Sequence, residues 1–226
     1  MEQIKIRGIK KSYGKEMAVQ ELDLTVNPGD FLTILGPSGC GKTTMLRAIA
    51  GLEEPDEGEI QFGDRVVFSR KQGVIIPPEN RNVGFIFQSY ALWPHMTVEQ
   101  NITLALKEKK LSNKEIESRL KKSLEMVQLE SYRKRYPSEL SGGQQQRVAI
   151  ARSLINDPEI ILADEPTGNL DPQTAATVFG MLMSLVRETG LASLIATHNP
   201  ALASQMDRVV TLRDGHLVEL DPAELA

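Results

Sequence analysis

The feature that most constrains the fold is the stretch GPSGCGKTT, which runs from Gly36 to Thr44. It fits the pattern G-x-x-x-x-G-K-[ST]. The apolar run DFLTILG before it predicts a buried strand, and KTTMLRAIAG after it predicts a helix with Gly51 just past its end. A glycine-rich turn between a strand and a helix directs backbone N–H groups at an anion. The pattern therefore predicts a phosphate-binding loop.

The loop residues divide the work of holding a nucleoside triphosphate. Lys42 is placed to reach the β- and γ-phosphates, and the hydroxyl of Thr43 is placed to ligate Mg²⁺. A chance glycine turn is the alternative, but the expected strand and helix on either side argue against it. The residues that we predict to bind nucleotide here are Gly36, Pro37, Ser38, Gly39, Cys40, Gly41, Lys42, Thr43 and Thr44.

Two acidic residues follow the apolar run IILA, which is expected to be another buried strand. Asp164 is at the position where a phosphate-binding protein of this kind needs a carboxylate to hold Mg²⁺, through a water molecule. Glu165 comes next and can orient or deprotonate a water that attacks the γ-phosphate. By itself, an acidic pair after a strand is more typical of a solvated turn. In a chain that also has a phosphate-binding loop, the roles at Mg²⁺ and at the attacking water are the favoured interpretation.

A second serine–glycine cluster, LSGGQQQR, runs from Leu140 to Arg147. Ser141 is placed to cap a helix that starts within the cluster. A serine and two glycines at a helix N-terminus also form a second anion site. A cap and a turn without any ligand is the simpler alternative.

Helix and turn signals outline the rest of the chain. Ser112 and Glu115 have capping-box spacing, Asp171 precedes a helix expected to stop near Gly190, and Asn199 precedes a further helix. The last segment, RVVTLRDGHLVEL, predicts a hairpin with its turn at 214–215. Apolar strands alternate with helices, which predicts a mostly parallel sheet covered on both faces. Shorter strands near the amino terminus, QIKIRGI, AVQELDLTV and GEIQFGDRVVF, predict an antiparallel β region.

Composition removes several classes of function. The net charge of −4 offers no basic surface for nucleic acid. No apolar run approaches the roughly 18 residues that a membrane span needs, and the amino terminus does not resemble a signal peptide. The single cysteine, Cys40, cannot form an internal disulfide, which is typical of a reducing compartment. We therefore expect a cytoplasmic protein with no nucleic acid partner.

The order of motifs along the chain resembles the nucleotide-binding subunit of an ABC transporter, over essentially all 226 residues. The resemblance implies a P-loop NTPase core with a mostly parallel sheet, an N-terminal antiparallel β region and an inserted helical subdomain. We expect one ABC-type ATPase domain over 1–226, with the core at 1–87 and 156–226 and the helical subdomain at 88–155. The motifs are Tyr13, the phosphate loop, Gln88, LSGGQQQR, IILADE, NLD and His198.

In that family LSGGQ is the signature motif, and it acts in trans, between two subunits packed head to tail around two Mg-ATP. The resemblance therefore implies that the second glycine cluster serves the ATP of a neighbouring subunit, and that a homodimer forms on ATP binding. Asp171 would lie across the dimer interface, although its role as a helix cap explains it equally well. The residues implied to contact the neighbour's ATP are Ser141, Gly142, Gly143 and Gln144.

The resemblance also assigns roles to three further residues. Tyr13 would stack on adenine, although an aromatic residue at a strand end is its simpler interpretation. Gln88 would contact Mg²⁺ and the attacking water while sensing a membrane partner, although a glutamine on the surface is unremarkable. His198 would hold the γ-phosphate and the geometry of Glu165, so the implied catalytic set is Glu165, His198 and Gln88, with ATP as the substrate.

Two branches of the family remain open. SYALWPHMTVEQNI, at 89–102, is similar to importer subunits, whereas LADEPTGNLDPQTA is similar to lipoprotein-releasing and macrolide-efflux ATPases. We expect contact with integral membrane permease subunits near Gln88–Ile102, where Leu92, Trp93 and Met96 are candidates for a groove, at the inner face of the cell membrane. A non-transport ABC ATPase of the cell-division, repair or translation type is the alternative.

Overall fold

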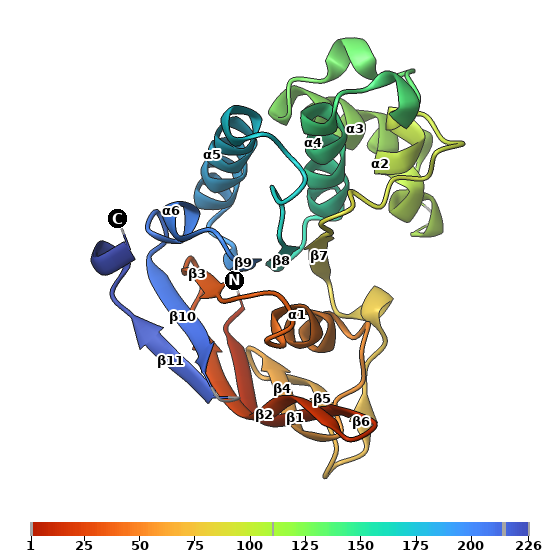
Figure 1. Cartoon of the computed structure of the whole chain (residues 1–226). Coiled ribbons are helices and arrows are strands. Elements are labelled where there is room, and N and C mark those ends of the chain that lie inside the picture. Colours follow the sequence, from red (N-terminus) through yellow and green to blue (C-terminus); the bar gives the residue numbers. More distant parts are fainter. Residues whose placement is uncertain (1, 110, 214–215, 226) are drawn as a thin grey trace.

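The computed structural model describes residues 2–109, 111–213 and 216–225. Figure 1 shows two sheets with α1 between them and a cluster of helices on the far side of the core sheet. The strands are β1 (Ile4–Tyr13), β2 (Glu16–Val26), β3 (Phe31–Leu35), β4 (Glu57–Phe62), β5 (Arg65–Ser69), β6 (Val74–Ile75), β7 (Val83–Ile86), β8 (Ile160–Asp164), β9 (Ala192–Thr197), β10 (Arg208–Arg213) and β11 (His216–Leu220). The helices are α1 (Lys42–Ala50), α2 (Val98–Glu108), α3 (Asn113–Met126), α4 (Gly142–Leu154), α5 (Pro172–Thr189) and α6 (Pro200–Ala203).

The core sheet has the strand order β11-β10-β3-β9-β8-β7. All neighbours from β10 to β7 are parallel, and only the β10–β11 pair is antiparallel. Alternate residues of each strand belong to different apolar cores: Phe31 packs with the helical side, and Leu32 packs with α1 and the second sheet. Burial on both faces explains why these strands read as continuous apolar runs. The predicted mostly parallel sheet is confirmed.

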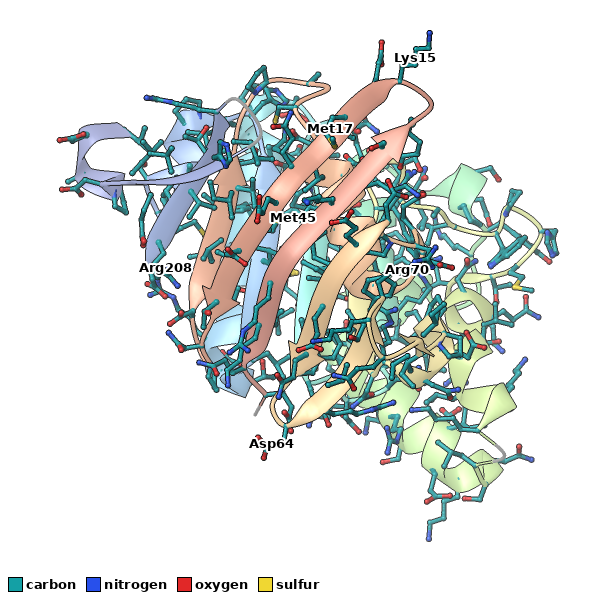
Figure 2. The ribbon with its side chains drawn as sticks, turned by 90° about the horizontal axis from the view of Figure 1, so that it is seen from below. Lys15, Met17, Met45, Asp64, Arg70 and Arg208 are labelled. Carbon is teal, nitrogen blue, oxygen red and sulfur yellow. The ribbon has the colours of Figure 1, made fainter. Side chains whose placement is uncertain are left out.

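The second sheet is antiparallel, in the order β2-β1-β4-β5-β6, which confirms the predicted β region near the amino terminus. Figure 2 views this sheet from below, with Lys15 at the β1–β2 turn and Asp64 at the opposite end. Met45 of α1 is fully buried in the core that β1, β2 and the core sheet share. The sheet thus holds α1 against the core strands and brings the β1–β2 turn close to the loop that precedes α1.

Helices α2, α3 and α4 lie between β7 and β8 in the chain and form the upper part of Figure 1. Their apolar faces bury Ile102, Leu120 and Ile150 in one cluster that continues into α5 and the core sheet. Because one core joins these helices to the sheet, the boundaries proposed at 88–155 remain a prediction about subdomains. The patterns did not predict β6, β7 or α2 as separate elements.

The predicted helix ends are confirmed where their partners are local. Ser112, Ser141 and Asp171 each accept a hydrogen bond from the backbone N–H three residues later, and Asn199 accepts one from Ala201. Gly51 and Gly190 end α1 and α5 with left-handed backbone, which glycine adopts without steric cost. Strands β10 and β11 pair as expected, while the predicted turn at 214–215 lies outside the described residues.

Candidate functional site

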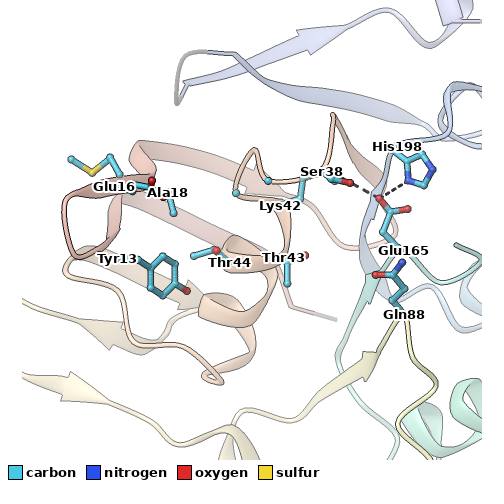
Figure 3. A pocket seen from close by; sticks show the side chains of 13 residues that line it. Tyr13, Glu16, Ala18, Ser38, Lys42, Thr43, Thr44, Gln88, Glu165 and His198 are labelled. Carbon is cyan, nitrogen blue, oxygen red and sulfur yellow. Dashed lines mark ion pairs between the residues drawn. The ribbon is translucent and has the colours of Figure 1, made fainter. Parts of the chain in front are cut away.

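A pocket of about 460 Å³ opens above the N-terminus of α1. Figure 3 shows that its walls come from the β1–β2 turn, the glycine-rich loop and the ends of β8 and β9. Segments far apart in the sequence therefore meet at one site. The lining residues are Tyr13, Glu16, Met17, Ala18, Ser38, Gly39, Gly41, Lys42, Thr43, Thr44, Gln88, Glu165 and His198.

Gly41 lets the loop turn into α1 against the β1–β2 hairpin. Its φ is +102°, and a Cβ there would lie 2.3 Å from the carbonyl oxygen of Ala18. Any side chain would push the loop away from β2, so the fit depends on glycine. The α1 helix begins at the next residue and points the positive end of its dipole into the pocket.

Lys42 is the buried cation of the pocket, with its side chain only 5% exposed. Its Nζ donates to the carbonyl oxygens of Gly36 at 2.6 Å and Pro37 at 2.9 Å. The same nitrogen lies 3.9 Å from Oε1 of Glu165, a contact drawn in Figure 3. These contacts hold the ammonium group at the mouth of the loop, where a phosphate would meet it.

Thr43 and Asp164 form the pair expected around Mg²⁺. The Thr43 hydroxyl donates to Oδ1 of Asp164 at 2.9 Å, and Asp164 is almost fully buried. Burial raises the pKa of the Asp164 carboxyl, and the hydrogen bond from Thr43 opposes that shift. A hydroxyl and a carboxylate are hard oxygen ligands, so this pair suits Mg²⁺. A bound cation would also offset the cost of burying the carboxylate.

Glu165 sits on strained backbone at the end of β8, with φ +47° in the left-handed region. Its N–H donates to the carbonyl of Ala196, which holds the turn in place. Oε1 of the same residue lies 2.9 Å from Nδ1 of His198, at the end of β9. The strain and the two contacts aim one carboxylate at the space between Lys42 and Gln88, as Figure 3 shows.

Gln88 reaches the same pocket from the segment after β7, and its backbone carbonyl accepts a hydrogen bond of 2.9 Å from Asn169 Nδ2. Asn169 was missed by the sequence patterns, because it belongs to a segment singled out for Asp171 alone. Lys11 and Glu53 were missed as well. Lys11 Nζ lies 5.3 Å from the centre of the Tyr13 ring and 2.8 Å from Glu53 Oε1.

Several predicted residues do not line this pocket. Gly36 and Pro37 contribute carbonyls to Lys42, Cys40 Sγ lies 4.0 Å from Lys42 Nζ, and Asp164 acts through Thr43. The second glycine cluster is elsewhere, at the N-terminus of α4 in the helical part of the molecule. None of its predicted contact residues is among those that line the pocket, namely Ser141, Gly142, Gly143 and Gln144.

Ser141 caps α4, as its place before the helix predicted. Ser141 Oγ accepts from the Gln144 N–H at 3.3 Å, and Gln144 Oε1 accepts from the Ser141 N–H at 2.9 Å. Gly143 packs so closely on α5 that a Cβ would lie 2.5 Å from Thr174. Ser141 itself is exposed, so the capped end of α4 faces solvent.

A second pocket of about 440 Å³ lies along β7, the edge strand of the core sheet. Phe85, Phe87 and Ala91 line it together with Trp93, whose side chain is half exposed. Of the three apolar residues predicted for a groove, only Trp93 lines this pocket. Leu92 instead packs, partly buried, against the core of the helices.

The fold and the first pocket define a P-loop nucleotide-binding protein. The ABC transporter family matches residues 19–168, which is more than half of the chain. The chain therefore belongs to the ABC transporter family of ATP-binding proteins.

Known proteins of high similarity share nearly all of this chain. The spermidine/putrescine import ATP-binding protein PotA of Pasteurella multocida is 45% identical over 215 residues, which cover 95% of this chain and 56% of that protein. The trehalose/maltose import ATP-binding protein MalK of Thermococcus litoralis is 42% identical over 218 residues, which cover 96% of this chain and 59% of that protein. The chain thus spans little more than half the length of these two relatives.

Solved structures agree with the fold. The dimeric post-hydrolysis structure of the ATP-binding cassette MJ0796 bound to ADP and Pi matches with a TM-score of 0.84 and 36% identity, covering 97% of this chain and 98% of that one. A second match is the structure of cbiO1 from Clostridium perfringens, part of the ABC transporter complex cbiONQ. Its TM-score is 0.86 and its identity is 27%, and the match covers 98% of this chain and 89% of that one. Within the described residues, we find no helix with the length and apolarity to cross a bilayer.

Proposed function

We propose that this chain is the ATP-hydrolysing subunit of an ABC importer, working as a head-to-tail homodimer at the cytoplasmic face of the cell membrane. The proposed direction of transport is that of the relatives PotA and MalK, both of which are import ATP-binding proteins. Cell-division, repair and translation functions receive no comparable support.

The proposed dimer rests on one observation: two helix N-termini that are suited to binding an anion lie apart from each other in the structure. One, the start of α1, lies in the first pocket, and the other, the start of α4, does not line that pocket. A γ-phosphate bound at the first end would meet the second only if another chain supplied it. The MJ0796 cassette is dimeric in its state with ADP and Pi, which supports dimerisation of this chain.

The pocket residues would perform the hydrolysis in defined roles. Lys42 and the loop N–H groups bind the phosphates, while Tyr13 stacks on the base. Glu165 accepts the proton of a water that attacks the γ-phosphorus, and the bond to the ADP oxygen breaks. His198 keeps the Glu165 carboxylate aimed, through the contact of 2.9 Å. Mg²⁺, held by Thr43, Gln88 and, through water, Asp164, would neutralise charge on the phosphate oxygens.

Permease subunits would dock over Gln88–Ile102, at the second pocket. Its aromatic and apolar walls and the half-exposed Trp93 suit an inserted helix. Gln88 is the first residue of this segment and also lines the first pocket. A docked helix and a bound nucleotide would therefore contact the same segment of the chain.

Size-exclusion chromatography of Glu165→Gln with Mg-ATP tests the function. Blocking the proton acceptor should trap the ATP-bound dimer, and adding Ser141→Arg should return it to a monomer while ATP still binds at the first pocket. If Glu165→Gln stays monomeric although it binds ATP, or if the double variant still dimerises, the head-to-tail arrangement is wrong. The wild-type rate of phosphate release, measured in parallel, tests the ATPase activity itself.

A further inference from the structure

The segment that carries Gln88 leaves β7 through a strained turn. Tyr90 and Ala91 have φ values of +62° and +49°, both in the left-handed region that non-glycine residues rarely adopt. Short local hydrogen bonds hold the turn: Tyr90 N–H donates to Phe87 at 3.2 Å, and Ala91 N–H donates to Ser89 at 2.7 Å. Two consecutive strained residues persist only where the surroundings enforce them.

Arg152, on α4, supplies that enforcement. Its guanidinium donates from one nitrogen to the carbonyl of Tyr90 at 2.8 Å and from the other to the carbonyl of Ala91 at 2.5 Å. Among the residues that the structure describes, Arg152 forms no ion pair, so these carbonyls are its polar partners. Burial lowers the pKa of Arg152. The guanidinium charge of Arg152 is therefore directed at backbone carbonyls instead of at solvent.

A second residue holds the start of the same segment. Asn169, between β8 and α5, donates to the carbonyl of Gln88 at 2.9 Å. The backbone is thus held at three carbonyls within four residues, from two elements that come much later in the chain. The Tyr90 hydroxyl also reaches the start of α4, where it lies 3.0 Å from the position of a Cβ on Gly142.

The hydrogen bonds from Arg152 and Asn169 to the carbonyls of Gln88, Tyr90 and Ala91 together form a clamp on the turn. This clamp borders the proposed docking pocket. Arg152, Ala91 and Trp93 all line it, so a helix inserted there would contact the clamp directly. The same α4 begins with the signature residues. A displacement at this pocket would therefore reach Gln88 through the turn and the signature through α4.

We propose that Arg152 and Asn169 are positioning residues that hold the strained turn at Tyr90 and Ala91, and thereby place Gln88 at the ATP and tie it to the signature helix. The inference rests on the proposed function, because it assumes that Gln88 takes part in hydrolysis. Arg152 does not line the first pocket. It acts by fixing backbone whose relaxation would withdraw Gln88.

The test compares Arg152→Lys with Arg152→Lys/Ala91→Gly, in the full chain. Lysine keeps the charge but lacks the planar fork that spans two carbonyls, and glycine removes the strain at φ +49°. Arg119→Lys is the matched control, because Arg119 also donates to a backbone carbonyl, that of Ile155, and pairs with Asp157 instead of with the turn. The readouts are hydrogen exchange of the peptide 87–93, ATP affinity and kcat.

We expect Arg152→Lys to speed exchange of this peptide at least about fivefold and lower kcat about tenfold, with ATP affinity within about twofold of wild type. Ala91→Gly should restore most of the lost kcat, and Arg119→Lys should leave exchange of the peptide, ATP affinity and kcat at their wild-type values.

Unchanged exchange of the peptide 87–93 in Arg152→Lys would overturn the clamp. So would a loss of kcat that Ala91→Gly leaves untouched, because Arg152 would then support the helices and not the turn. A wild-type chain without ATPase activity would refute the proposed function separately, while the exchange comparison would still decide the clamp.

Discussion

Lys11 and Tyr13 lie two positions apart on β1, so both side chains leave the strand on the same face. Lys11 is held by Glu53 at 2.8 Å and by the carbonyl of Glu54 at 2.8 Å, with its ammonium group over the Tyr13 ring. The hydrogen bond to Glu53 raises the pKa of Lys11, so it stays charged. The tyrosine is half exposed, and the lysine packs against the ring on which we propose that the base stacks.

Lys11→Met should therefore raise KM for ATP by roughly threefold to tenfold without lowering kcat, because only the base-stacking platform loosens. Steady-state kinetics measure the change. Affinity for inorganic tripolyphosphate, which has no base, should stay at the wild-type value. Lys10→Met is the control, since Lys10 pairs with Glu57 and not with Tyr13. Equal weakening of tripolyphosphate binding would show that Lys11 supports the phosphate loop.

At the scale of single elements, α1 is fixed at its far end by a buried arginine. Arg81 is 2% exposed and donates to the carbonyls of Ala48 and Ile49 in the last turn of α1, and to Ile76. Burial lowers the pKa of Arg81 to about 10, so it remains charged at neutral pH. A cation there satisfies end carbonyls and opposes the negative end of the helix dipole.

Arg81→Met should lower the free energy of unfolding by about 2–4 kcal/mol, because the Ile49 and Ile76 carbonyls each lose the donor that Arg81 supplies and the Ala48 carbonyl keeps the Gly51 N–H alone. Urea unfolding followed by circular dichroism measures this. Arg65→Met is the control, an exposed arginine that donates to Asn80 nearby, and it should cost well under about 1 kcal/mol. Similar losses in both variants would contradict a specific role for the α1 carbonyls.

Ion pairs from the segment at Arg133 and Lys134 connect helices α2 and α3. Arg133 donates to Glu99 on α2 and forms two hydrogen bonds with Glu117 on α3, while Lys134 also pairs with Glu99. Burial alone would raise the pKa of Glu99, but the hydrogen bonds from Lys134 and Arg133 outweigh it and the pKa is lowered. The ionised Glu99 therefore stabilises the folded chain.

Because the folded pKa lies below the unfolded one, this stabilisation is present above about pH 4.5 and is lost as pH falls through the folded pKa. Glu99→Gln should cost roughly 1–2 kcal/mol at neutral pH and progressively less as the pH falls below about 4.5. Urea unfolding across that range checks the slope. A cost that does not change with pH would mean that packing, and not charge, makes Glu99 important.

At the scale of the whole molecule, the first pocket joins the phosphate loop to Tyr13, Gln88 and Glu165, but no residue of the second glycine cluster lines it. Mixing two inactive variants tests whether a neighbouring chain supplies that cluster. Lys42→Ala damages the phosphate loop, and Ser141→Arg damages the signature. A mixed head-to-tail dimer has one intact site, so the mixture should regain roughly a quarter of wild-type ATPase activity if sites act independently. No recovery, in chains shown to form mixed dimers, would exclude independent sites completed in trans.

The sequence alone determined features whose partners lie close in the chain. The glycine-rich loop and the caps at Ser112, Ser141 and Asp171 were predictable, because each capping hydrogen bond closes within three residues. Buried parallel strands were predictable because apolar side chains on both faces leave a continuous apolar run. Strand order and the small strands β6 and β7 were not, since pairing depends on distant segments.

Only the tertiary structure decided which distant side chains meet. Lys11 reaches Glu53, and Arg152 reaches the carbonyl of Tyr90 across 62 positions of sequence. No local pattern encodes such contacts, because a charged residue on a helix reads equally as a solvated face. The residue types within each motif indicate which ligand that motif can bind. The packing of α4 against the turn after β7 decided that Gln88 and the signature helix are held together.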